Sequence, residues 1–193
     1  MDSQKRKVIT AVLLLTSIAA FASMEGWKLF RSSNGFEVIY PDTWYRRGAS
    51  DDTLRIFSSN GVMGGIGIII KRGQAAIFVS EEQDTSTNNL AQVIDYYTRD
   101  SSVILPERDI SGMGGEQGCR VLKEVTFREA VVPKEDIPQT MKVPYFIRSV
   151  YFCEFKDNKI VTLILTNWEG DTRQLEYQEV ALRMAKSIRG IKQ

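Results

Sequence analysis

The stretch that decides the fold runs from Phe36 to Trp44 and reads FEVIYPDTW. Its apolar residues Phe36, Val38 and Tyr40 alternate along the chain, which is typical of a mostly buried strand. Pro41 follows and predicts the end of that strand, because proline cannot donate a ladder hydrogen bond. We therefore expect an opening strand whose proline turn directs Trp44 towards the sheet or its edge.

The remaining pattern predicts an α+β fold, with a largely antiparallel sheet and helices packed on it. Apolar residues recur at helical spacing over 89–100 and again from residue 171 to residue 191. We expect Thr87 or Asn88 to cap the first helix. For the second helix, Asp171 is the expected N-terminal cap with Gln174 in the capping-box position, and Gly190 is expected to end the helix. Further strands are expected at 54–58, 66–71, 103–111, 118–128, 145–156 and 160–167, with 74–80 compatible with a short strand.

Composition excludes several classes of function. The 25 Lys and Arg residues are matched by 24 Asp and Glu residues, whereas a nucleic-acid binder normally shows a basic excess. The chain has no histidine, which excludes histidine-based catalytic triads, the common zinc sites and an imidazole switch. No catalytic residue and no cofactor is predicted, and we expect a protein that is not an enzyme. A histidine-free exported enzyme of unrecognised type stays open as an alternative.

The N-terminus has the layout of a secretory signal peptide. Lys5, Arg6 and Lys7 precede the uncharged run 8–22, which ends in the small-x-small pattern Ala-Phe-Ala. We therefore expect a signal peptide over 1–22 and one globular domain over 23–193. The protein is expected in the periplasm, at the extracellular face or in the thylakoid lumen, after its N-terminal segment has engaged the membrane during export. The alternative is that residues 8–22 are retained as a membrane anchor, although this run is shorter than the about 20 residues that a membrane-spanning helix needs.

The order of these elements resembles the PsbP-like superfamily. The matching residues are the opening strand with Tyr40, Pro41 and Trp44, and the segment Ala185-Lys186-Ser187-Ile188 that closes the last helix. That superfamily includes the PsbP proteins of oxygenic photosystems, DcrB-type bacterial envelope proteins and Ran-binding Mog-type proteins.

The resemblance implies a three-layer α/β/α sandwich and an accessory, binding or assembly role with a protein partner in an envelope or membrane complex. A membrane-tethered assembly factor or a secretion chaperone is the alternative. Some photosynthetic members bind manganese or calcium, but no matching ligand set is found in this sequence.

Cys119 and Cys153 are the two cysteines, and they fall on the strands expected at 118–128 and 145–156. The residue numbers of opposed positions in an antiparallel pair have a constant sum. A register that is nearly symmetric about the 130–144 connection therefore places the two cysteines opposite or diagonal to each other. Strand alternation puts Cys119 on the face of Val125 and Phe127. Neighbouring cysteines usually oxidise in exported proteins, which predicts a cross-strand disulfide. Two buried free thiols are the alternative.

The connection between those two strands, over 130–144, is a candidate partner loop. At about 15 residues it is longer than the 2–5 residues of most hairpin loops, and long loops on a rigid sheet often contact partners. A proline-stiffened loop without a partner is the alternative. The residues singled out in it are Pro133, Lys134, Glu135, Asp136 and Pro138.

Two further groups are weaker candidates for binding. Glu81, Glu82 and Asp84 offer oxygen ligands, but calcium takes six or more, so a solvated acidic loop is the favoured interpretation. Trp168 lies where the last strand meets the last helix and is a pocket candidate. The alternative is that Trp168 is an aromatic residue at the edge of the core.

Overall fold

The computed structural model describes residues 25–48, 50–59, 73–82, 89–99, 102–111, 118–130 and 145–191. The expected signal peptide, the strand expected at 66–71 and most of the 130–144 connection lie outside these ranges. Within them, no helix is long and apolar enough to cross a membrane.

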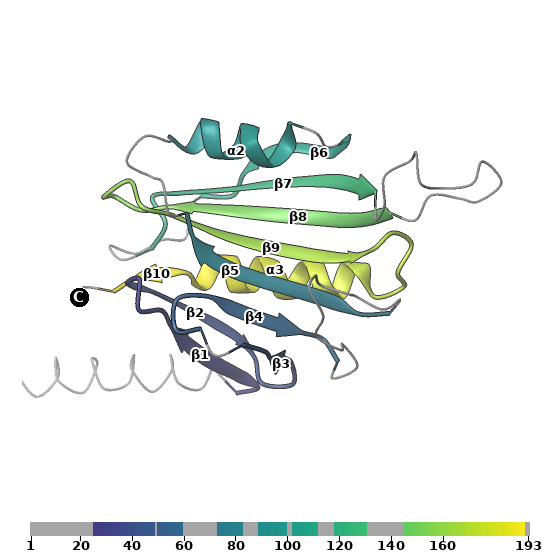
Figure 1. Ribbon diagram of the computed structural model, residues 1–193, viewed down its shortest axis with the longest axis horizontal. Helices are drawn as coiled ribbons and strands as arrows, with labels where there is room; N and C mark the ends of the chain where they lie inside the picture. The colour runs from purple at the N-terminus through teal and green to yellow at the C-terminus, as the bar shows by residue number, and fades with distance from the viewer. Residues whose placement is uncertain are drawn as a thin grey trace, which may run out of the picture.

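Seven strands form one antiparallel sheet in the order β3-β4-β5-β9-β8-β7-β6 (Figure 1). Its centre consists of long strands rich in β-branched and aromatic residues, which favour a pleated, packed surface. The large antiparallel sheet expected from the sequence is confirmed. The strands are β3 (Tyr45–Arg46), β4 (Leu54–Phe57), β5 (Ala75–Glu81), β6 (Ser102–Asp109), β7 (Val121–Ala130), β8 (Tyr145–Glu154) and β9 (Ile160–Trp168).

A helix packs on each face of this sheet, as the α+β prediction requires. On one face, called the α2 face, helix α2 (Leu90–Thr98) buries Leu90, Val93 and Ile94 against a cluster that includes Val125 and Phe127. The opposite face, called the α3 face, carries the larger core. There, helix α3 (Gln174–Ser187) buries Tyr177, Ala181, Met184 and Ala185.

The helix ends differ from those expected. Asn89 caps α2, accepting a hydrogen bond from the Gln92 backbone while the Gln92 side chain accepts from the Asn89 backbone. In α3 the N-cap is Arg173, which makes no side-chain cap hydrogen bond. Asp171 lies two residues earlier and accepts from the Arg173 backbone amide at 2.9 Å, so its local hydrogen bond stabilises the preceding turn.

The C-terminal end of α3 also differs from the prediction. The helix ends at Ser187, and Gly190 belongs to a short strand, β10 (Arg189–Gly190). This strand joins β1 (Trp27–Arg31) and β2 (Phe36–Pro41) in a separate three-stranded sheet with β2 at its centre. The sequence predicts β2 but not the small sheet, because that sheet needs a partner from the far end of the chain.

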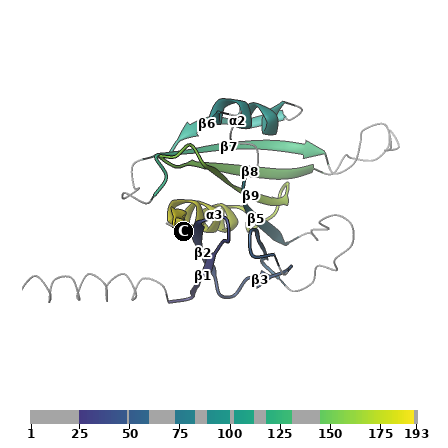
Figure 2. The same ribbon diagram turned by 60° about the vertical axis from the view of Figure 1, so that its left-hand side comes forward.

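Helix α3 contacts both sheets and lies between β2 and β9 in Figure 2. The Ile39 backbone N–H donates to Ser187 Oγ at 3.1 Å, so the two segments that carry the family resemblance touch each other. Trp44 is buried, and its ring lies edge-on to Tyr177 of α3 with the centroids 5.9 Å apart. The proline turn therefore directs Trp44 into the core around α3.

Candidate functional site

Among the described strands of the large sheet, the outer strand β6 carries the most exposed run of large apolar side chains. It is the last strand at its edge among the described strands, and all eight of its residues are exposed. Val103, Ile104 and Leu105 keep 49%, 47% and 55% of their surface exposed. These three residues form the β6 edge surface. Natural proteins usually shorten exposed edges or place charges on them, so such a surface indicates a contact site.

The pairing of β6 with β7 is irregular. The register shifts between Val103 and Leu105 and again between Leu105 and Arg108. These bulges, together with Pro106, blunt the outer backbone edge against the addition of another strand. The β6 edge surface therefore exposes its side chains more than it exposes a continuous row of backbone hydrogen-bonding groups.

A cavity of about 280 Å³ opens beside the β6 edge surface. It lies where β6 meets β7, and Leu105 belongs both to its wall and to the exposed run. A hollow of this size next to aliphatic side chains can receive an apolar side chain of a partner. Its lining residues are Leu105, Pro106, Glu107, Arg108, Glu124 and Thr126.

The wall of this cavity holds a buried carboxylate with two partners. Glu124 is only 9% exposed and accepts a hydrogen bond from Arg108 Nε at 3.0 Å. It also accepts from the hydroxyl of Tyr151 on β8, and burial together with the Glu124 charge raises the pKa of that hydroxyl. Glu124 is thus held as a charge-compensated carboxylate, which suits a structural wall better than a general base.

Alkaline pH is expected to weaken the fold through Tyr151. Its pKa is raised in the folded protein, whereas an unfolded tyrosine ionises near about pH 10. The contribution to stability is therefore complete below about pH 10 and is lost as the pH rises further. Urea titrations from about pH 8 to 11 should show a decline in the free energy of unfolding that is shallower in Tyr151→Phe. Tyr96→Phe, at a side chain that is 74% exposed, is the control. Equal slopes for Tyr151→Phe and the wild type would contradict the expectation.

Two members of the acidic cluster make contacts within the fold. Glu81 forms an ion pair with Lys159 at 3.4 Å. Glu82 accepts hydrogen bonds from the Tyr97 hydroxyl at 2.9 Å and from Thr162 at 2.8 Å, which links α2 to the sheet. Asp84 lies outside the described residues. Within the described ranges, no group of three or more metal-binding side chains is placed to hold an ion.

Trp168 lies at the end of β9 on the α2 face, beyond the area that α2 covers. Its ring packs on Phe146 with the centroids 4.8 Å apart. Together with Phe57, Ala76 and Phe78 these two residues form one apolar cluster across four strands, called the aromatic face. Trp168 is thus part of a packed aromatic surface on β9, the central strand, while the described cavity lies between β6 and β7 and does not include Trp168.

The structure joins Cys119 and Cys153 in the predicted disulfide, with their Cα atoms 5.2 Å apart. The expected register is wrong, because Leu122 is the residue opposite Cys153. Cys119 precedes β7 and lies outside the β7–β8 pairing. Its neighbour Gly118 instead forms an antiparallel bridge with Arg189 of β10.

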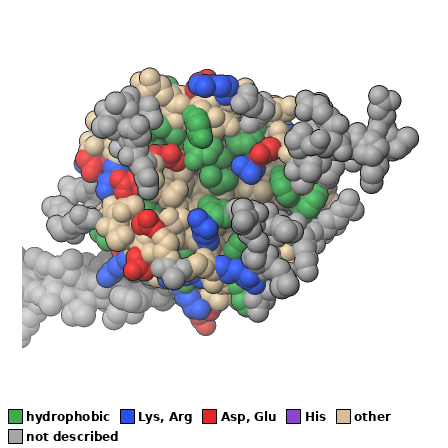
Figure 3. All heavy atoms as spheres, in the orientation of Figure 1, with side chains coloured by type: hydrophobic (Ala, Val, Ile, Leu, Met, Phe, Trp, Pro, Cys, Tyr) green, Lys and Arg blue, Asp and Glu red, His purple; other side chains and the backbone are tan. Residues whose placement is uncertain are grey.

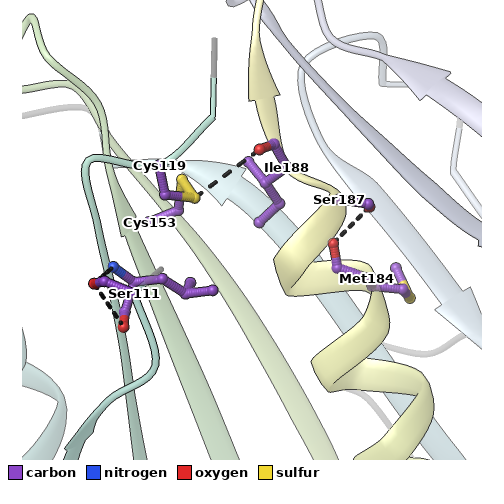
Figure 4. The surroundings of a disulfide bond; sticks show 7 residues. Ser111, Cys119, Cys153, Met184, Ser187 and Ile188 are labelled. Carbon is purple, nitrogen blue, oxygen red and sulfur yellow. Dashed lines mark hydrogen bonds between the residues drawn. A yellow bond between two sulfur atoms is a disulfide. The ribbon is translucent and has the colours of Figure 1, made fainter. Parts of the chain in front are cut away.

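The expected face of Cys119 is also wrong. Cys119 packs with the core on the α3 face, while Val125 and Phe127 belong to the α2 face. Figure 4 shows the bond beside Ile188, where α3 gives way to β10. The disulfide therefore fastens β8 to the junction of the two sheets.

The predicted partner loop falls outside the described residues. Its two ends are fixed, since Ala130 and Tyr145 pair with each other at the end of the β7–β8 ladder. The role assigned to Pro133, Lys134, Glu135, Asp136 and Pro138 stays a prediction.

Sequence reasoning missed the β6 edge surface. The strand itself was expected at 103–111, but three successive aliphatic residues are typical of a buried strand. Pro106 is the one local signal of an edge, since proline within a strand points to an edge position.

Comparison with known proteins identifies the fold. No protein-family model matches the chain, and no curated protein matches it by sequence. The crystal structure of the Saccharomyces cerevisiae Ran-binding protein Mog1p is similar, with a TM-score of 0.54 at 11% identity, covering 86% of this chain and 96% of that chain. A mutant of protein Mog1 gives a TM-score of 0.50 at 10% identity, with the same coverage of both chains. The chain therefore has a mostly antiparallel α+β fold similar to that of Mog1p.

Proposed function

We propose that this chain is an exported, non-enzymatic accessory or binding domain that acts through protein–protein contacts made by the β6 edge surface. The observation that carries the proposal is the exposure of Val103, Ile104 and Leu105 beside a cavity. A similar solved structure is that of a Ran-binding protein, which is consistent with a fold that serves protein binding. Export rests on the signal-peptide pattern of residues 1–22, with the cell envelope or thylakoid lumen as the site of action.

A partner that covers the β6 edge surface gains hydrophobic free energy. Burying an aliphatic side chain fully is worth about 1.5–3 kcal/mol, so three half-exposed ones offer about 3 kcal/mol. The flanking charges Glu107 and Arg108 are paired with Lys123 and Glu124, which leaves the aliphatic centre as the main attraction. This arrangement matches an apolar interface centre with a polar rim.

The test compares a double variant, Val103→Lys with Leu105→Lys, against the wild type in capture of proteins from membrane extract. The variant is expected to lose the specific partner by about tenfold or more, since it buries charge at the interface centre. Leu175→Lys is the matched control, because Leu175 is 76% exposed on α3 and lies outside the β6 edge surface. Equal recovery of the partner by the double variant and the control would overturn the proposal, provided that both unfold cooperatively.

Export is tested separately by the intact mass of the secreted protein. The signal-peptide interpretation predicts a chain that begins at residue 23. Retention of residues 1–22 would instead support the membrane-tethered assembly factor or secretion chaperone.

A further inference from the structure

The small sheet ends at β1 with an edge that no other described strand covers. Its strand order is β1-β2-β10, so β1 pairs with β2 alone. Figure 1 shows β1 near the lower border of the molecule, with β2 on its inner side. The other border of this sheet is closed, since Arg189 of β10 bridges Gly118. Within the described residues, β1 is therefore the open edge of the small sheet.

The backbone bonds at the two ends of β1 show which of its groups point outward. The Asp42 N–H donates to the Gly26 carbonyl at 2.9 Å, and the Ser32 N–H donates to the Phe36 carbonyl at 2.8 Å. Both pairs continue the β1–β2 register. Because hydrogen-bonded and non-bonded pairs alternate in an antiparallel ladder, every second residue of β1 directs its N–H and C=O away from β2. These outward groups, called the β1 edge, belong to Trp27, Leu29 and Arg31.

The β1 edge is regular, unlike the outer edge of β6. The pairing of β1 with β2 runs from Trp27 to Arg31 without a register shift, and β1 contains no proline. The outward row ends at Ser33, whose N–H donates to the Asp51 carbonyl at 2.8 Å. Backbone groups along a regular open edge are a template for the backbone of an added strand.

A row of alternating charges crosses the small sheet and ends at β1. Arg189 of β10 lies opposite Glu37 of β2, and Glu37 lies opposite Arg31 of β1. Arg31 Nε donates to the Glu37 carboxylate at 3.2 Å, yet the Arg31 side chain keeps 69% of its surface exposed. Opposite charges at opposed positions stabilise neighbouring strands. A carboxylate on an added strand, placed opposite Arg31, extends this row.

The next row on the same face of the small sheet is apolar. Leu29 lies opposite Ile39 and keeps 42% of its surface exposed. Because side chains two residues apart share a face, an added strand that places an acid opposite Arg31 places another side chain on this face opposite Leu29. In an antiparallel strand the acid comes first and the second side chain follows two residues later. The β1 edge therefore fits the pattern acid-x-aliphatic.

The charge of β1 favours an acidic segment over a second copy of this chain. Lys28 and Arg31 are exposed, and β1 contains no acidic residue. Figure 3 shows Lys and Arg side chains, with Asp and Glu side chains among them, along the lower part of the molecule. Two β1 strands side by side bring like charges together, whereas an acidic strand neutralises them.

We propose that the β1 edge binds an extended acidic segment of a protein partner by strand addition, with an acid opposite Arg31 and an aliphatic residue opposite Leu29. Backbone hydrogen bonds supply the affinity of such a contact, and the two side-chain positions supply its specificity. The contact is separate from the β6 edge surface, which exposes side chains more than backbone groups. It gives the chain a second binding surface whose partner has a defined conformation and sequence pattern.

The probe is a fluorescein-labelled, threonine-rich octapeptide in which Glu is followed two residues later by Val. Its binding to the exported protein is measured by fluorescence anisotropy. In the proposed pairing the N–H groups of Glu and Val point towards β1, while the N–H of the intervening Thr points away. N-methylation of the Val is expected to weaken binding by about tenfold or more, because it removes a hydrogen bond and adds bulk at the contact. N-methylation of the intervening Thr should change binding by less than about twofold.

Leu29→Pro removes an outward N–H from the protein itself. That N–H makes no bond to β2, so proline leaves the β1–β2 hydrogen bonds in place, as it does on natural edge strands. We expect binding of the peptide to weaken by about tenfold or more. Leu29→Ala is the matched comparison, because it loses the side chain but keeps the N–H. Its affinity should fall between those of Leu29→Pro and the wild type.

Arg31→Glu tests the charge at the β1 edge. It is expected to weaken binding by about tenfold or more, because it replaces an attraction with a repulsion. Arg99→Glu is the matched control, since Arg99 is also an exposed arginine in a surface ion pair, with Asp95 of α2. Helix α2 packs on the far side of the large sheet from the small sheet, so this change should alter binding by less than about twofold in physiological salt.

The outcomes that would overturn the proposal are distinct. Equal binding of the two N-methylated peptides excludes strand addition, and an equal loss in Arg31→Glu and Arg99→Glu indicates general attraction of charge. Self-association of the exported protein that Leu29→Pro abolishes, measured by analytical ultracentrifugation, assigns the edge to a second copy.

The double variant Val103→Lys with Leu105→Lys separates this proposal from the β6 edge surface. It should bind the peptide like the wild type, and a loss of binding in it would assign the peptide to the β6 edge surface instead. Failure of the β1 edge and failure of the β6 edge surface are therefore distinguishable. Thermal unfolding of each variant verifies that it is folded.

Discussion

Replacing Cys119 and Cys153 together by alanine is expected to lower the free energy of unfolding by about 4 kcal/mol, because the bond closes a long loop in the unfolded chain. The two residues are 34 positions apart, and Cys153 is fully buried. The bond also holds the segment before β7 against β10, so its loss loosens the junction of the two sheets. Urea unfolding of the oxidised wild type, the reduced wild type and the double variant measures the effect.

The reduced wild type is expected to unfold close to the double variant, since both lack the same constraint. A loss below about 1 kcal/mol in the double variant would contradict the assigned role. The bond itself is tested by counting thiols in the exported, denatured and unreduced protein. Two thiols in that assay would rule out the bridge.

Trp44→Ala is expected to cost about 3–5 kcal/mol, the usual range for removing a large buried aromatic side chain. Trp44 is 8% exposed and meets Tyr177 of α3 edge-on, so its removal leaves a cavity between the β2–β3 turn and the helix. The neighbouring variant Tyr45→Ala is the control, because Tyr45 is 44% exposed and should cost about 1 kcal/mol or less. Equal losses in the two variants would mean that Trp44 does not anchor α3.

The sequence predicts well those elements whose own residues define them. The strands β7, β8 and β9 and the helix α3 are long and show clear periodicity, and they lie close to their expected positions. The helix ends were less predictable, because Asp171 can form either a helix cap or a local turn hydrogen bond. Tertiary packing places it in the turn before Arg173.

The candidate sites depend on relations between distant segments. Isoleucine is a residue type usually found in the core, so the sequence alone does not mark Ile104 as exposed. Only the sheet order shows that its strand is the outermost of the described strands. The disulfide was predicted in spite of a wrong register, because Cys119 reaches Cys153 from outside the ladder.

The central strand of the small sheet has a consequence for the order of folding. β2 pairs on one side with the adjacent β1, but on the other side with β10, and its Ile39 amide reaches Ser187, 148 residues away. Contacts of such long range form late, because closing a long loop costs conformational entropy before any contact repays it. As the chain emerges from the ribosome, β2 therefore keeps one edge open until β10 has appeared.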